Sequence, residues 1–166
     1  MGPPPLSCGF SPLPGGSFQS PRTSLNILVV DDNDAARNAL ARFLRHCNFQ
    51  VSCAVDGECA WDELRKGNFD GMVTDNDMPR LSGLDLVRRL RAIPSRMPII
   101  LMSGLMPHTE TDFEALITPG MAIEKPFSFA LLEMHARRLF TRDLSVRAAL
   151  NGDYGKHGEE QYLSPQ

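Results

Sequence analysis

Apolar and polar positions along the middle of the chain follow a repeating pattern that predicts five strand–helix units. Continuous apolar runs, such as 27–30 and 99–102, suit strands that are buried on both faces. Between these runs, apolar residues recur at helical spacing, as Leu40 and Leu44 do. The predicted strands are 26–31, 50–55, 71–75, 98–103 and 120–124, and the predicted helices are 34–46, 57–66, 83–92, 108–117 and 127–140. This alternation predicts an α/β fold with a doubly wound parallel sheet and right-handed crossovers.

Polar residues mark the start of three of the predicted helices. A short polar side chain placed just before a helix can accept a hydrogen bond from one of its first free backbone N–H groups. Asn33 or Asp32 can cap the first helix in this way, Ser82 can cap the third, and Ser128 or Phe127 opens the fifth.

The composition changes at both ends of this repeating region. Residues 1–23 are rich in proline, glycine and serine, so we expect a disordered tail there. Residues 24–141 are expected to form one domain. Residues 142–166 are expected to hold a short helix over 144–150 and a flexible polar tail, which is too short to fold as a second domain.

Composition and charge exclude several classes of protein. The net charge of −3 offers no overall basic field for binding nucleic acid. No apolar run approaches the roughly 18 residues that a membrane span needs, and the first residues lack the features of a signal peptide. The four cysteines show no metal-finger spacing. We therefore expect a soluble cytoplasmic protein with neither a membrane nor a nucleic acid as partner.

Carboxylates follow two of the predicted strands. Asp31 and Asp32 come directly after the first apolar run, and Asp75 ends the third. Because parallel strands present their carboxyl ends at one edge of the sheet, these three groups should gather there. Three like charges close together need a cation, and all-oxygen ligation suits Mg²⁺. A lone Asp-Asp pair after a strand could instead cap a helix. The presence of Asp75 makes that interpretation of the pair less favoured.

Asp75 and two further groups at the same edge suit phosphoryl chemistry. Pro79 biases the segment after Asp75 toward a fixed loop, so that the Asp75 carboxylate could attack phosphorus. Ser103 ends the fourth strand and could donate to a phosphoryl oxygen, although such a serine is more often only a cap. Lys125 follows the fifth strand and precedes Pro126, and its ammonium could pair with a phosphate or a carboxylate rather than lie at the surface.

Taken in order, these motifs resemble a two-component response-regulator receiver domain. The resemblance covers residues 24–141 and rests on four motifs, 30–32, 75–79 with 82–83, 102–104 and 125–127. It implies a five-stranded, flavodoxin-like (βα)₅ sheet with strand order 2-1-3-4-5. It also implies a protein that assists its own phosphorylation and dephosphorylation rather than a conventional enzyme.

The resemblance assigns a role to each site residue. Asp75 would be the phosphoacceptor, and Asp32 and Asp75 would bind Mg²⁺ directly, with Asp31 acting through water. The backbone carbonyl of Asp77 would complete the protein ligands. Ser103 would bind the phosphoryl group in the active state, and Lys125 would pair with Asp75 or its phosphate.

Partners follow from the same resemblance. The phosphoryl donor would be a sensor histidine kinase or a histidine phosphotransfer protein. With no room for an output domain in the tail, the output would lie in a separate protein target, which the sequence does not name. A homodimer through the face of the fourth and fifth helices is one arrangement that the sequence allows.

Two positions depart from the usual receiver pattern. Ala122 stands where the family usually has an aromatic residue, three positions before the lysine, so the output surface would respond weakly or differently. Asp77 adds a carboxylate beside the acceptor. This carboxylate could interact with the metal or repel an attacking water. We expect Asp77 to alter the lifetime of the phosphate, in a direction that the sequence leaves open.

Two other functions compete with this interpretation. The segment 73–77 also resembles the nucleophile motif of haloacid-dehalogenase-like phosphatases, with Asp75 as nucleophile and Asp77 as acid and base. That family needs an acidic pair after the lysine, and Glu133 and Asp143 are misplaced for it. The other competitor is a receiver fold used only for binding, which Ala122 favours.

Overall fold

The computed structural model describes residues 24–105 and 112–141, which form one α/β unit. Within this part, strands and helices alternate as predicted. The strands are β1 (Asn26–Val30), β2 (Gln50–Ala54), β3 (Gly71–Asp75), β4 (Ile99–Ser103) and β5 (Gly120–Glu124). The helices are α1 (Asp34–His46), α2 (Gly57–Lys66), α3 (Gly83–Arg91), α4 (Phe113–Ile117) and α5 (Phe129–Phe140). The predictions for 1–23 and 142–166 lie outside the described residues.

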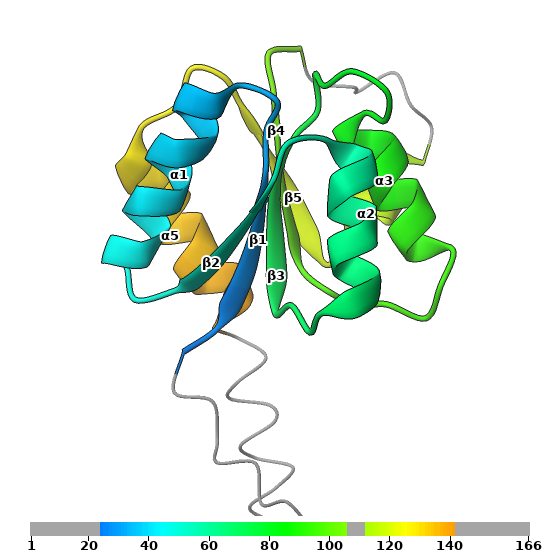
Figure 1. Cartoon of the computed structure of the whole chain (residues 1–166), viewed down its shortest axis with the longest axis horizontal. Coiled ribbons are helices and arrows are strands. Elements are labelled where there is room, and N and C mark those ends of the chain that lie inside the picture. Colours follow the sequence, from blue (N-terminus) through cyan, green and yellow to red (C-terminus); the bar gives the residue numbers. More distant parts are fainter. Residues whose placement is uncertain (1–23, 106–111, 142–166) are drawn as a thin grey trace, which may run out of the picture.

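The five strands form one parallel sheet in the order β2-β1-β3-β4-β5, which confirms the expected topology. Helices cover both faces: α1 and α5 lie on one side, and α2 and α3 lie on the other (Figure 1). Since β1 and β3 are neighbours at the centre of the sheet, residues far apart in sequence meet where these strands end.

Alternate residues of the strands feed two separate core layers, as the two-residue period of a strand requires. Ile27 and Val29 pack with α1 and α5, whereas Leu28 and Val30 pack with α2 and α3. All four are fully buried, which accounts for the continuous apolar run that predicted a strand covered on both faces.

Helix starts agree with the capping prediction. The side chain of Asn33 accepts hydrogen bonds from two N–H groups in the first turn of α1. Ser82 and Ser128 cap α3 and α5 in the same way. Because Asn33 takes the capping role in α1, Asp31 and Asp32 remain available at the sheet edge.

The fourth helix, predicted over 108–117, begins at Phe113 in the described residues, with Asp112 just before it. The described helix α4 has five residues, Phe113–Ile117, and 108–111 lie outside the described residues. Phe113 and Ile117 are buried against the layer of α2 and α3, so the apolar periodicity that predicted this helix is accounted for by these two contacts.

Candidate functional site

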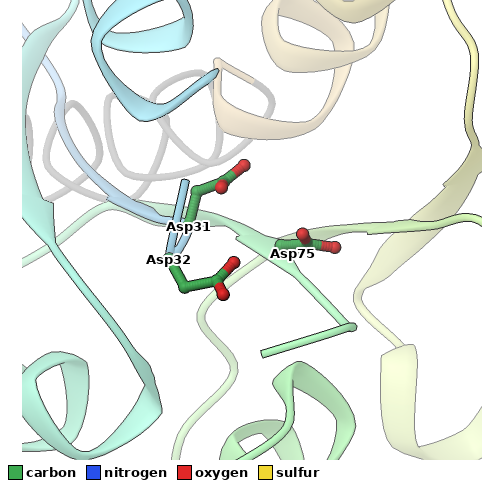
Figure 2. A group of neighbouring side chains, drawn as sticks. All are labelled: Asp31, Asp32 and Asp75. Carbon is green, nitrogen blue, oxygen red and sulfur yellow. The ribbon is translucent and has the colours of Figure 1, made fainter. Parts of the chain in front are cut away.

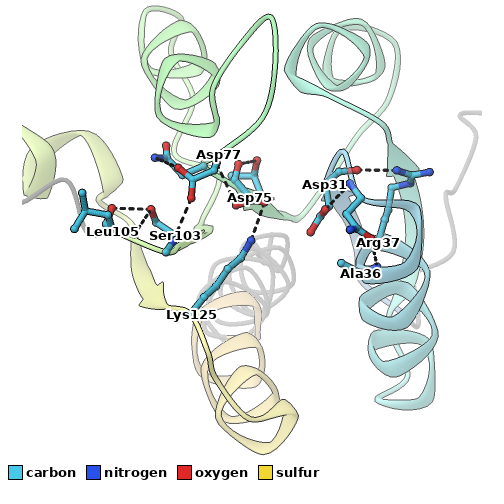
Figure 3. A network of polar contacts seen from close by, with 12 residues as sticks. Asp31, Ala36, Arg37, Asp75, Asp77, Ser103, Leu105 and Lys125 are labelled. Carbon is cyan, nitrogen blue, oxygen red and sulfur yellow. Dashed lines mark hydrogen bonds and ion pairs between the residues drawn. The ribbon is translucent and has the colours of Figure 1, made fainter.

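The first strand delivers two carboxylates to the sheet edge. Asp31 is only 1% exposed, whereas Asp32 is exposed. The backbone N–H of Asn33 donates to Asp31 Oδ1 at 2.9 Å, and Arg37 donates to the backbone carbonyl of Asp31 at 2.7 Å. Figure 3 shows Arg37 beside Asp31, and Arg37 also pairs with Asp34 one turn away. The chain is therefore held firmly where β1 turns into α1.

The third strand ends at Asp75, whose side chain is nearly buried. Asp75 Oδ1 accepts from the backbone N–H of Asp77 at 3.2 Å, and Asp75 Oδ2 pairs with Lys125 Nζ at 2.7 Å. The following turn is tight: a Cβ on Gly83 would lie 2.2 Å from the backbone oxygen of Asp75. Only glycine fits there, so Gly83 fixes how closely α3 approaches the strand end.

Asp31, Asp32 and Asp75 form an acidic cluster, with one carboxylate oxygen of each lying within 4.8 Å of the others. Figure 2 shows the three side chains converging from the ends of β1 and β3. Burial is the main cause that raises the pKa of Asp31; the hydrogen bond from Asn33 opposes it, and the charge of Asp75 adds to it. Such a cluster is electrostatically unfavourable without a cation, and an all-carboxylate donor set of this size fits Mg²⁺.

Ser103 reaches the same edge, where its side chain is fully buried. Its hydroxyl donates to the carbonyl of Leu105 at 2.7 Å and accepts from the N–H of Leu105 at 3.3 Å (Figure 3). The hydroxyl is thus engaged within its own turn in this structure. The sequence placed Ser103 at the site and also left open a capping role, and the hydroxyl does accept a nearby backbone N–H.

The side chain of Asp77 turns away from the acidic cluster. Its Oδ2 accepts a hydrogen bond from the backbone N–H of Gly104, at 3.2 Å, in the turn after β4. This contact joins the loop after β3 to the turn after β4. No local pattern predicts this contact, because Gly104 lies 27 positions further along the chain.

A second ion pair beside the site was also missed. Arg80 pairs with the nearly buried carboxylate of Asp56, which caps α2 through the N–H of Cys59. Arg80 has a positive φ of 69°, an unfavourable conformation for a residue other than glycine. The pair ties the loop that follows Asp75 to the start of α2 and helps to hold Arg80 in this conformation.

An apolar groove adjoins the acidic cluster, between α1 and the start of α5. It has a volume of about 370 Å³, and Asp31 and Lys125 form its polar end. Phe129, which is 44% exposed, lines it and stacks on Phe43 of α1 at 4.7 Å between ring centres. The groove places apolar surface directly beside the site.

Known proteins resemble the chain in both sequence and structure. MprA, a response regulator of Mycobacterium bovis, is 37% identical over 114 residues; the match covers 69% of this chain and 49% of MprA, so the chain spans about half of that relative. The chemotaxis response regulator CheY4 of Vibrio cholerae superimposes with a TM-score of 0.64 at 26% identity, covering 70% of this chain and 99% of CheY4.

A third similar protein was solved with ligands. The response regulator TrrA of Thermotoga maritima, in complex with Mg²⁺ and BeF, gives a TM-score of 0.62 at 29% identity, with 69% of this chain and 98% of TrrA covered.

Across residues 24–105 and 112–141, every helix is too short or too polar to cross a bilayer. The family model of the response regulator receiver domain matches residues 27–137, and the chain therefore belongs to that family.

Proposed function

We propose that the chain accepts a phosphoryl group on Asp75 and signals through the resulting conformational change. The observation that carries this proposal is the environment of Asp75. Its carboxylate is nearly buried, one oxygen pairs with Lys125 at 2.7 Å, and it belongs to the cluster with Asp31 and Asp32. Membership of the receiver family also favours this role over the phosphatase alternative.

The acidic cluster is proposed to hold Mg²⁺. Asp32 and Asp75 would provide direct carboxylate ligands, Asp31 would act through water, and the backbone carbonyl of Asp77 would complete the protein ligands. When bound, Mg²⁺ would offset negative charge on the phosphoryl oxygens. The complex of TrrA with Mg²⁺ and BeF supports this assignment by analogy.

In the proposed reaction, Asp75 is the nucleophile and Lys125 pairs with the product. An oxygen of Asp75 attacks phosphorus in line with the bond to the donor, a phosphohistidine of a histidine kinase or phosphotransfer protein. The phosphorus–oxygen bond forms while the phosphorus–nitrogen bond breaks, and the electron pair of the broken bond stays on the imidazole. Lys125, already beside Asp75, then pairs with the new phosphate.

Ser103 and Ala122 are proposed to shape the response. For its hydroxyl to bind a phosphoryl oxygen, Ser103 must give up its hydrogen bond to Leu105. Ala122, half-buried on β5 beside Leu101, provides no aromatic ring to follow that movement. We therefore expect the output surface formed by α4, β5 and α5 to respond differently from that of receivers with the aromatic residue.

The wider setting of the chain is also proposed. We infer one receiver domain over 24–141, action in the cytoplasm, and a separate downstream protein as target. A homodimer through α4 and α5 stays a prediction. The receiver used only for binding remains the second candidate, because Ala122 favours it.

Intact-mass spectrometry after incubation with acetyl phosphate and Mg²⁺ tests the phosphoacceptor role. We expect the wild type to gain one phosphoryl group and Asp75→Asn to gain none. Label that persists in Asp75→Asn would move the acceptor to another residue. If the wild type stays unlabelled with acetyl phosphate and with a phosphorylated histidine phosphotransfer protein, despite binding Mg²⁺, the binding-only alternative would be favoured.

A further inference from the structure

Asp77 lies between the phosphoacceptor and the turn after β4 (Figure 3). Its backbone N–H donates to Asp75 Oδ1, and its side-chain Oδ2 accepts from the N–H of Gly104, both at 3.2 Å. The amide of Asn76 lies 3.5 Å from its other carboxylate oxygen. Asp77 thus contacts the acceptor through its backbone and the neighbouring turn through its charge.

The carboxylate of Asp77 is not part of the metal cluster. Within the described residues, the acidic group whose oxygens lie within 4.8 Å of one another consists of Asp31, Asp32 and Asp75. A fourth carboxylate directly beside that group would be expected to turn toward a cation site. Its bond to Gly104 instead gives this charge a separate partner.

The end of β4 is held by backbone hydrogen bonds from Asn76 N–H to the Met102 carbonyl and from Lys125 N–H to the Ser103 carbonyl, both at 2.8 Å, whereas the described part of the turn beyond it, residues 104–105, is exposed. Leu105 is 83% exposed, and a Cβ placed on Gly104 would meet only the Oδ2 of Asp77, at 3.7 Å. The hydroxyl of Ser103 bonds within the turn itself, to Leu105. Within residues 104–105, the hydrogen bond from the Gly104 N–H to Asp77 therefore joins this turn to the loop of the acceptor.

We propose that Asp77 is a positioning residue that acts as an anionic latch, holding the Gly104 amide until a phosphoryl group on Asp75 displaces it. This proposal rests on the proposed function of Asp75. A phosphoryl group on Asp75 adds negative charge beside Asp77, and like charges repel. The latch then opens, which frees the Gly104 N–H and the turn that carries Leu105.

The latch also sets a direction for the effect of Asp77 on phosphorylation. Its charge opposes the approach of an anionic phosphodonor, so removing the charge should speed phosphorylation by about fivefold, as expected for one screened like-charge contact. Asp77→Asn removes the charge and keeps an oxygen that can accept from Gly104. Asp77→Ala removes both, which separates the electrostatic role from the hydrogen bond.

The test uses the full chain and two measurements. The initial rate of labelling by acetyl phosphate at saturating Mg²⁺ should rise about fivefold in both variants. Amide hydrogen exchange at Gly104, followed by NMR without a phosphodonor, should accelerate in Asp77→Ala and stay near the wild-type rate in Asp77→Asn. Asp62→Asn is the matched control, because it removes an exposed carboxylate from α2, and both measurements should match the wild type.

The outcomes separate the latch from the function on which it depends. If the wild type is labelled and Asp77→Asn is labelled no faster, the latch alone is overturned. Unchanged amide exchange at Gly104 in Asp77→Ala would also overturn the latch alone. Loss of Mg²⁺ affinity in Asp77→Asn as large as that in Asp32→Asn would make the side chain a ligand and would also overturn it. A wild type that accepts no label from any donor would refute the proposed function and the latch together.

Discussion

Replacing Asp31 with asparagine should stabilise the protein without metal and destabilise it relative to the wild type with metal. Asp31 is 1% exposed and shares the cluster with Asp32 and Asp75. Asparagine is nearly the same size, and its side-chain oxygen can still accept from the N–H of Asn33. The substitution therefore removes mainly a buried negative charge.

The distance within the cluster sets the size of this effect. The carboxylate oxygens of the cluster lie within 4.8 Å of one another. Two unit charges at that separation repel by about 0.9 kcal/mol in water and about 3.5 kcal/mol at an effective dielectric constant of 20. Attraction to Lys125 offsets part of this repulsion. We therefore expect Asp31→Asn to raise the free energy of unfolding by about 1–2 kcal/mol in EDTA.

Mg²⁺ should reverse the order of the two proteins. A ligand at one hundred times its dissociation constant stabilises the wild type by about 2.7 kcal/mol, and a variant with weakened binding gains less. Urea unfolding followed by the fluorescence of Trp61, in EDTA and in Mg²⁺, measures both differences. A variant that is less stable than the wild type in EDTA would refute the electrostatic reasoning, and an equal gain from Mg²⁺ would refute the metal role.

The pH dependence has a definite sign. Burial above all raises the pKa of Asp31 above its usual value of 3.8, so the native state holds this proton more tightly than the unfolded state. The contribution of Asp31 to stability therefore falls as pH rises from 3.8 through the raised pKa. Asp31→Asn should lack this component of the pH dependence in EDTA.

Substitutions at three further sites, one of them with a matched control, test other parts of the structure. Gly83→Ala should destabilise by about 1–3 kcal/mol and slow acetyl phosphate labelling, because its Cβ would lie 2.2 Å from the backbone oxygen of Asp75; an unchanged unfolding midpoint would contradict this. Arg91→Met should lower the free energy of unfolding in urea by about 2 kcal/mol, because Arg91 donates to three backbone carbonyls. The control Arg96→Met, at an exposed position, should lower it by less than about 0.5 kcal/mol. Equal losses in the two variants would argue against a stabilising role of the Arg91 hydrogen bonds. Burial lowers the pKa of His135 below 6.5, so the wild type should lose stability as pH falls from 6.5 toward that lowered pKa, and His135→Gln should remove that slope; parallel pH profiles would refute it.

The sheet and the gathering of the site residues followed from sequence because both depend on strand ends. Once the apolar runs are parallel strands, Asp31, Asp32 and Asp75 must meet at one edge, whatever the details of the loops. Lys125 follows the fifth strand, so it was expected at the same edge. The resemblance to receiver domains implied that it pairs with Asp75, as it does in the structure. Backbone geometry alone determines these placements.

Side-chain direction at the edge was less predictable. Asp77 could have faced the metal or an attacking water, and it faces Gly104 instead. This choice depends on the turn after β4, whose position no local pattern encodes. Arg80 shows the same limit, since its pair with Asp56 joins two loops that only the folded chain brings together.

Two arginines of α3 make contacts beyond their own helix. Charged residues on a helix usually form a solvated face. Here Arg89 reaches Glu58 and lies over the ring of Trp61, and Arg91 turns toward backbone carbonyls near α4. Both side chains therefore link neighbouring helices, which the helical period of α3 alone could not indicate.

The place of Lys125 after the last strand matters during protein synthesis. The ribosome releases β1 and β3, with their three carboxylates, before it releases β5 and the ammonium that pairs with Asp75. A nascent chain that has reached only β4 therefore carries the acidic cluster without its own counter-charge. Because Mg²⁺ is the proposed ligand of this cluster, cellular Mg²⁺ should favour the early pairing of β1 with β3 on the ribosome.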